Sequence, residues 1–262
     1  MGLAGQLPRR VSRAATLALI AGTIGGAAVL ATDVALARAR EYAKPDPRLA
    51  LRTSHGEEDA PVLRLTLLGD SSSIGVGVEE VSETVGGRLA ELLAAQGFRV
   101  ELSSVGVSGS RSSDLATQVA RALLGPAPEV AVVLVGSNDA TSLRRPAEAA
   151  AALGTAVRRL RMAGVSVVVG TCPDLGAARA IAPPLRQIVG MLGRRVARAQ
   201  TAAVIAADGE PVDLAGITGP VFRADAGTLS VDGYHPSADG YRIWAHALLP
   251  AVIDAIGVPD HS

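Results

Sequence analysis

Two short motifs near opposite ends of the chain hold the residue types needed for nucleophilic catalysis. Gly69-Asp70-Ser71 directly follows a run of branched apolar residues, and Asp232 and His235 lie three residues apart near the carboxyl end. A serine hydroxyl becomes a nucleophile when a neighbouring base removes its proton, and an imidazole held by a carboxylate is such a base. The spacing of Asp232 and His235 allows one hydrogen bond between their side chains, which leaves the second imidazole nitrogen to face Ser71.

Two further motifs offer hydrogen-bond donors for the negative oxygen that forms when a serine attacks a carbonyl group. Gly109 follows Ser108, and Asn138 precedes Asp139, in each case shortly after a strand-like run. Such an oxyanion needs donors that are already in place before the reaction. The candidate donors are the side-chain amide of Asn138 and the backbone amides of Gly109 and Ser71.

A parallel sheet is the element that would bring these motifs together. From Val62 onward, apolar runs alternate with segments of helical period, a pattern typical of a parallel sheet covered by helices on both faces. We expect about five parallel strands, at residues 63–68, 98–102, 130–135, 165–169 and 202–206. Ligands bind outside the carboxyl ends of the strands in such sheets, so the motifs are predicted to meet at one edge.

Composition sets limits on the function. The 262 residues are 48% hydrophobic, enough for the core of one domain with an N-terminal extension. Acidic and basic residues balance at 25 each, so no global attraction for nucleic acid is expected. Cys172 is the single cysteine of the chain and is predicted to be a buried thiol at a strand end. His55, His246 and His261 are not spaced as metal ligands, and we predict no metal and no cofactor.

The N-terminal region predicts association with a membrane. Three arginines precede residues 14–32, which carry no charge and as a helix would just span a bilayer. Residues 35–37 (Ala-Leu-Ala) are typical of a cleavage site for an export signal. A cleaved signal, an uncleaved single-pass anchor and a helix belonging to the globular domain are the three alternatives. We expect an exported or membrane-anchored, extracytoplasmic protein that associates with the membrane through residues 14–32.

The chain is therefore divided into three parts. Residues 1–40 are predicted to be the signal or anchor segment, and residues 41–61, which are polar and contain prolines, a linker. Residues 62–258 are predicted to form the catalytic domain. The sequence indicates no oligomeric state.

The motifs, in this order, resemble those of the SGNH (GDSL-like) hydrolase family. Ser71 matches the nucleophile of its first block, Gly109 and Asn138 match the oxyanion residues of the second and third, and Asp232 and His235 match its Asp-x-x-His block. The resemblance implies a flavodoxin-like, three-layer α/β/α sandwich and metal-free hydrolysis of esters through an acyl-serine intermediate. It also implies an oxyanion hole formed by the Ser71 and Gly109 amides and by Asn138.

Several departures and alternatives accompany this resemblance. Ser72 follows the nucleophile where many members have leucine, Ser137 stands where many have a second glycine, and Gly106 is a neighbour that Gly109 can be confused with. An acyltransferase that uses the same site and a non-catalytic envelope binding module of the same fold are the alternative functions. Short-chain esters, acetylated carbohydrates and lysolipids are all compatible with the sequence as substrates.

Overall fold

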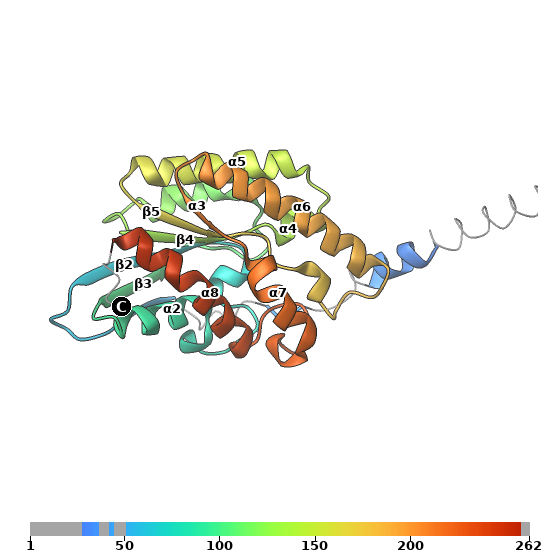
Figure 1. The fold of residues 1–262 in the computed structure, drawn as a ribbon, viewed down its shortest axis with the longest axis horizontal. Coiled ribbons are helices and arrows are strands. Elements are labelled where there is room, and N and C mark those ends of the chain that lie inside the picture. The colour runs from blue at the N-terminus through green and yellow to red at the C-terminus, as the bar shows by residue number, and fades with distance from the viewer. Residues whose placement is uncertain (1–27, 37–41, 45–50, 258–262) are drawn as a thin grey trace, which may run out of the picture.

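A six-stranded sheet with helices on both faces forms three layers (Figure 1). The computed structural model describes residues 28–36, 42–44 and 51–257. The strand order is β1-β3-β2-β4-β5-β6, in which the last five are parallel and β1 joins the edge as an antiparallel strand. The strands are β1 (Arg52–His55), β2 (Val62–Gly69), β3 (Arg99–Ser104), β4 (Val130–Leu134), β5 (Ser166–Gly170) and β6 (Glu210–Val212). The predicted fold class, with its five parallel strands, is confirmed.

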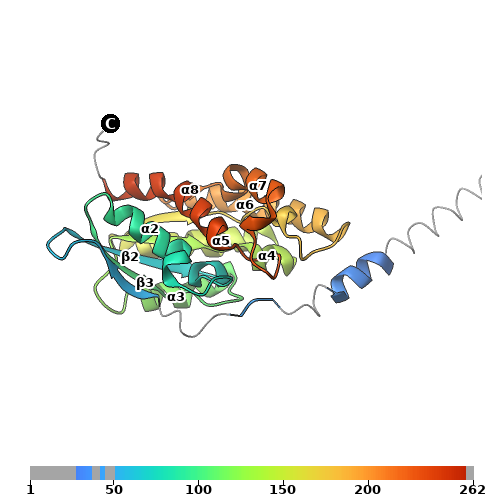
Figure 2. The same cartoon turned by 90° about the horizontal axis from the view of Figure 1, so that it is seen from below.

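Each face of the sheet packs on its own set of helices (Figure 1, Figure 2). The helices that cover one face are α2 (Val85–Ala94), α7 (Leu214–Ala224) and α8 (Ala238–Ile256). The helices on the other are α3 (Leu115–Ala122), α5 (Pro146–Met162) and α6 (Leu185–Ile205). Leu65 and Leu67 of β2 point to the first set, and Leu68 points to the second. All three are fully buried, and each such side chain contributes about 2 kcal/mol to folding.

Two regions differ from the sequence prediction. Residues 202–206, predicted as a strand, lie at the end of α6, and the fifth parallel strand is β6. A short apolar run fits a buried helix as well as a strand, which is why the pattern was misleading. The predicted linker, residues 41–61, contains β1, which pairs with β3 through four residues. This part of the linker therefore belongs to the sheet.

The N-terminal prediction falls largely outside the described residues. Of residues 14–32, those up to residue 27 are not described, and residue 37 of the predicted cleavage site is not described either. Residues 28–36 are helical. Within the part of the chain that the structure describes, no helix is both long and apolar enough to cross a bilayer.

Two buried glutamines tie the carboxyl ends of three neighbouring strands to the helices that cover them. Gln118 of α3 accepts a hydrogen bond from the Gly69 amide at 2.7 Å and donates one to the Gly69 carbonyl oxygen at 2.9 Å. Gln200 of α6 accepts from the Cys172 amide at 2.8 Å and donates to the Val135 carbonyl oxygen at 2.9 Å. These bonds satisfy backbone amides and carbonyl oxygens at the strand ends, which are buried away from water.

Replacement of Gln200 by leucine tests this role. The variant leaves the Cys172 amide and the Val135 carbonyl without their partner, and each such buried group costs about 1 to 3 kcal/mol. We expect Gln200→Leu to lower the free energy of unfolding by about 2 to 4 kcal/mol in urea denaturation. Gln187→Leu, at an exposed position of the same helix, is the matched control and should stay within about 0.5 kcal/mol of the wild type. Equal stability of the two variants would contradict the role of Gln200.

Candidate active site

Ser71 stands two residues after the end of β2, at the start of the short 3₁₀ helix η1 (Ser71–Ile74). The turn that presents it depends on Gly69, whose φ is 132° and where a Cβ would lie 1.8 Å from a backbone oxygen of β4. Asp70 caps η1, because its carboxylate accepts a hydrogen bond from the Ser72 amide at 3.0 Å. A turn of this shape aims the Ser71 hydroxyl away from the sheet.

The structure brings Ser71, His235 and Asp232 together in one row. The Nε2 atom of His235 is 3.0 Å from the Ser71 hydroxyl, and its Nδ1 atom is 2.6 Å from Oδ2 of Asp232. Asp232 and His235 lie on the turn that precedes α8. His235 is 164 residues from Ser71 along the chain. The His235 side chain is 9% exposed, so a small reactant can reach it while bulk water is mostly excluded.

Asp232 is surrounded by hydrogen-bond donors. Its Oδ1 atom accepts from the Ser230 hydroxyl at 2.8 Å, the Tyr234 amide at 2.8 Å and the His235 amide at 2.9 Å. Its Oδ2 atom accepts from the Ala43 amide at 3.0 Å in addition to the imidazole. Burial acts to raise the pKa of this carboxyl, but the hydrogen bonds from His235, Tyr234 and Ala43 outweigh it and hold the pKa below its usual range. Asp232 is therefore ionised at neutral pH.

Gly109 and Asn138 line the same cavity as Ser71 and His235. One proton of the Asn138 side-chain amide bonds to the Ser110 carbonyl oxygen at 3.0 Å, and the amide carries a second proton. Gly109 has a φ of 81° and open space where a Cβ would be. The alternative, Gly106, does not line the cavity.

The loop that carries Gly109 is fastened by residues that the sequence analysis did not identify. Asp139, which is buried, accepts hydrogen bonds from the amide of Ser112 at 3.0 Å and from its hydroxyl at 2.9 Å. Gln118 donates to the Ser110 hydroxyl at 3.0 Å. Gln118 adjoins the apolar stripe of α3 at Leu115 and Val119, and a polar residue beside such a stripe is the one signal that the sequence offered.

Cys172 is fully buried, as predicted from its place after an apolar run. Burial raises the pKa of its thiol, helped by the nearby charges of Asp70 and Asp139. The thiol therefore stays protonated and contributes to packing against α6.

The cavity beside Ser71 has a volume of about 420 Å³. One side presents the polar groups of Ser71, Gly109, Asn138 and His235. The apolar side chains that line the cavity come mainly from the start of α6 and the loop before it, with Leu143 from the loop before α5: Leu143, Ile181, Leu185, Ile188, Val189 and Leu192. Apart from His235, none of the described residues that line it has an ionisable group other than the phenols of Tyr42 and Tyr234.

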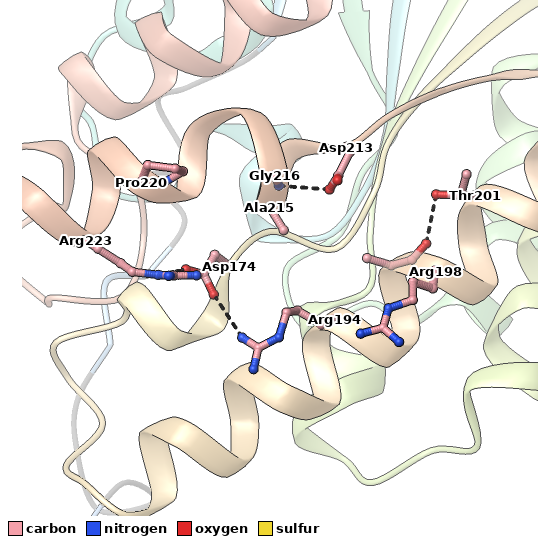
Figure 3. Close-up of a pocket in the computed structure, with 10 residues that line it drawn as sticks. Asp174, Arg194, Arg198, Thr201, Asp213, Ala215, Gly216, Pro220 and Arg223 are labelled. Carbon is pink, nitrogen blue, oxygen red and sulfur yellow. Dashed lines mark hydrogen bonds and ion pairs between the residues drawn. The ribbon is translucent and has the colours of Figure 1, made fainter.

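A second cavity, of about 300 Å³, lies between α6 and α7 (Figure 3). Asp174 is buried there, with its carboxylate paired to Arg223 and, at 3.9 Å, to Arg194. Figure 3 shows these guanidinium groups approaching the carboxylate from the two helices. None of the predicted catalytic or oxyanion residues lines this cavity, and its ion pairs link the loop after β5 to α6 and α7.

Comparison with known proteins agrees with these motifs. A model of the GDSL-like lipase/acylhydrolase family matches residues 67–243. The chain belongs to this family. The expected resemblance to SGNH (GDSL-like) hydrolases is thus confirmed.

A GDSL-like esterase of Mycobacterium tuberculosis is 44% identical to the chain over 197 residues. The match covers 74% of the chain and 63% of that protein, so the chain spans less than two thirds of this relative's length.

Among solved structures, a lipase/acylhydrolase from Enterococcus faecalis has a TM-score of 0.59 at 22% identity and covers 76% of the chain and 100% of its own length. A catalytic mutant of an acetylxylan esterase from Geobacillus stearothermophilus has a TM-score of 0.54 at 19% identity, covering 77% and 97%. These structures support the fold.

Asp70 is a second buried carboxyl near His235. Its surroundings raise its pKa, whereas those of Asp232 lower the pKa of that carboxyl. Burial raises its pKa to about 6, although the hydrogen bond from Ser72 and the charge of His235 act to lower it. In the unfolded chain this carboxyl titrates near 3.8. Between these two values the folded state binds the proton more tightly, so the contribution of Asp70 to stability falls as the pH rises.

Asp70→Asn should remove this pH dependence. One pKa unit corresponds to about 1.4 kcal/mol, so the stability of the variant relative to the wild type should increase by about 2 kcal/mol between pH 4 and pH 8. Urea denaturation of both proteins across this range measures the difference. Asp59→Asn changes an exposed carboxylate outside the site and serves as the control. A stability difference that stays constant with pH would show that Asp70 does not titrate as described.

Proposed function

We propose that the protein is a serine esterase that cleaves carboxylic esters through an acyl-serine intermediate. The observation that carries the proposal is the row of hydrogen bonds from Ser71 through His235 to Asp232, at 3.0 Å and 2.6 Å, on the rim of an open cavity. In the first step, the Ser71 oxygen attacks the ester carbonyl while Nε2 of His235 takes its proton. Asp232 keeps Nδ1 protonated and stabilises the imidazolium that forms.

The negative oxygen of the tetrahedral intermediate is stabilised by three donors in this proposal. They are the backbone amides of Ser71 and Gly109 and the second proton of the Asn138 side-chain amide. Because Asn138 is held by its bond to Ser110, its amide is oriented before substrate arrives. Donors fixed in this way need no reorganisation during the reaction, and each contributes a factor on the order of 10² to 10³ in rate.

When this intermediate collapses, a lone pair of the negative oxygen re-forms the C=O double bond, and the bond from that carbon to the alcohol oxygen breaks. His235 gives its proton to the leaving alcohol oxygen, and the acyl group remains on Ser71. A water molecule then attacks the acyl-serine while His235 accepts its proton. The second tetrahedral intermediate breaks to a carboxylic acid, and the proton returns from His235 to the Ser71 oxygen.

The cavity supports esters whose acyl part is an apolar chain. Ile188 and Leu192 of α6 face the space beside Ser71, and the wall that they belong to offers no charged group to a sugar or a phosphate. An apolar chain that enters this space gains about 25 cal/mol for each Å² of surface removed from water. The acetyl group is too short to contact much of this wall.

The assignment of the nucleophile can be tested by replacing Ser71. We expect Ser71→Ala to lower kcat for p-nitrophenyl ester hydrolysis by at least about 10⁴-fold. The variant should also no longer be labelled by a fluorophosphonate, as detected by mass spectrometry. Ser73→Ala is the matched control, because it removes only the bond from the Ser73 hydroxyl to the Asp70 carbonyl oxygen. Labelling of the Ser71→Ala protein by the fluorophosphonate would show that another residue is the nucleophile.

The acyl-chain assignment predicts a preference between substrates. We expect kcat/KM to be higher for p-nitrophenyl octanoate than for the acetate. Ile188→Asp places a charge in the apolar wall and should lower kcat/KM for the octanoate by at least about tenfold, with a smaller effect on the acetate. Met191→Asp, at a 41% exposed position of the same helix, is the control. The proposal of an apolar acyl chain would be wrong if both substrates lost the same factor in Ile188→Asp.

A further inference from the structure

A segment from the N-terminal side of the predicted catalytic domain reaches the candidate active site. The backbone amide of Ala43 donates a hydrogen bond to Oδ2 of Asp232 at 3.0 Å, across 189 residues of sequence. Tyr42 and Ala43 also line the cavity that contains Ser71 and His235. The predicted linker thus supplies part of the wall of the site.

The bond from Ala43 goes to the carboxylate oxygen that holds the imidazole. Oδ2 accepts from Nδ1 of His235, whereas the donors to Oδ1 all come from the same turn as Asp232 itself. Among the residues that the structure describes, the Ala43 amide is the one other donor recorded at Oδ2. It therefore fixes the direction of the lone pairs that receive the imidazole proton, and it occupies a place that a water molecule would otherwise take.

Tyr42 makes a second contact between the same segment and the catalytic turn. Its ring packs edge-on against Tyr234, with the ring centroids 5.1 Å apart. Tyr234 packs in the same manner against the imidazole of His235, at 5.2 Å. Edge-to-face contacts of this kind contribute about 0.5 to 1.5 kcal/mol beyond the area that they bury. Tyr42 and Ala43 therefore hold the acid through a hydrogen bond and the base through a neighbouring ring.

We propose that Tyr42 and Ala43 are positioning residues of the active site, acting on His235 through Asp232 and Tyr234. This inference rests on the proposed roles of Ser71, His235 and Asp232. The segment sets the angle between carboxylate and imidazole and keeps water away from Oδ2. Loss of the Ala43 bond removes one of the two donors recorded at Oδ2, which weakens the hold of the carboxylate on the imidazole.

The test uses the full-length chain with Ala43→Pro, because proline lacks the amide proton that bonds Asp232. We expect kcat/KM for the octanoate ester, and the rate of fluorophosphonate labelling, to fall about tenfold, the effect of one hydrogen bond to a charged group. KM should change by less than about twofold. Ala43→Gly keeps the amide proton and should lose less than Ala43→Pro in each measurement.

Two further measurements separate positioning from a general loss of structure. The downfield proton resonance of Nδ1 of His235, assigned by its absence in His235→Gln, should shift in Ala43→Pro and stay in place in Ala43→Gly. Tyr42→Ala, which removes the contact with Tyr234 and leaves the Ala43 amide, should lower the labelling rate less than Ala43→Pro. The melting temperature should change little, because Ala43 lies outside the sheet and the three hydrophobic core clusters.

A double-mutant cycle tests whether Ala43 acts through Asp232. Asp232→Asn alone should cost about 10⁴-fold in kcat, because the amide favours the wrong imidazole tautomer. In that background Ala43→Pro should cost less than about twofold. A full tenfold loss there, or wild-type kinetics together with an unshifted Nδ1 resonance in Ala43→Pro, would overturn the inference. Activity that persists in Ser71→Ala would instead refute the proposed function, and the resonance would still report on the Ala43 bond.

Discussion

The candidate site depends on a carboxylate that stays charged although its side chain is only 4% exposed. Removing an ion from water is costly unless hydrogen bonds replace those that water made. Around Asp232 this replacement is nearly complete, with donors on both oxygens from the turn, the imidazole and the N-terminal segment. The turn must adopt one shape to supply them, and that shape also directs the imidazole toward Ser71.

Asp70 shows what happens to a carboxyl that lacks such an environment. It lies directly before Ser71 and is buried, yet among the described residues the Ser72 amide is the one backbone donor recorded at its carboxylate. Burial therefore dominates and its pKa rises, whereas hydrogen bonds dominate at Asp232 and its pKa falls. Two carboxyls close to one imidazole thus have different chemical roles because of their donors, although they are the same residue type.

The sequence predicted those parts of the fold and site that are marked by side chains. The β-branched run of β4 and the Asp-x-x-His spacing carry local signals, and both identified the right elements. The apolar run at residues 202–206 carried a signal too, but a helix and a strand produce the same one at that length. β1 lies in a polar stretch, and it joins the sheet through backbone hydrogen bonds that any sequence can make. The contact between Ala43 and Asp232 is of the same kind, because its donor is a backbone amide and the side chain of Ala43 gives no signal of it in the sequence.

The edge strand β1 and the Ala43 amide have a joint consequence for how this protein is delimited. The match to the family model begins at residue 67, whereas β1 of the sheet begins at Arg52 and Tyr42 contacts the turn that carries Asp232 and His235. The stretch that the family model matches is therefore shorter than the part of the chain that forms the sheet and contacts Asp232. A chain trimmed to the residues that the family model matches would keep Ser71, Asp232 and His235 and would still lose the Ala43 amide that bonds the Asp232 carboxylate, so measurements on it would describe a different site.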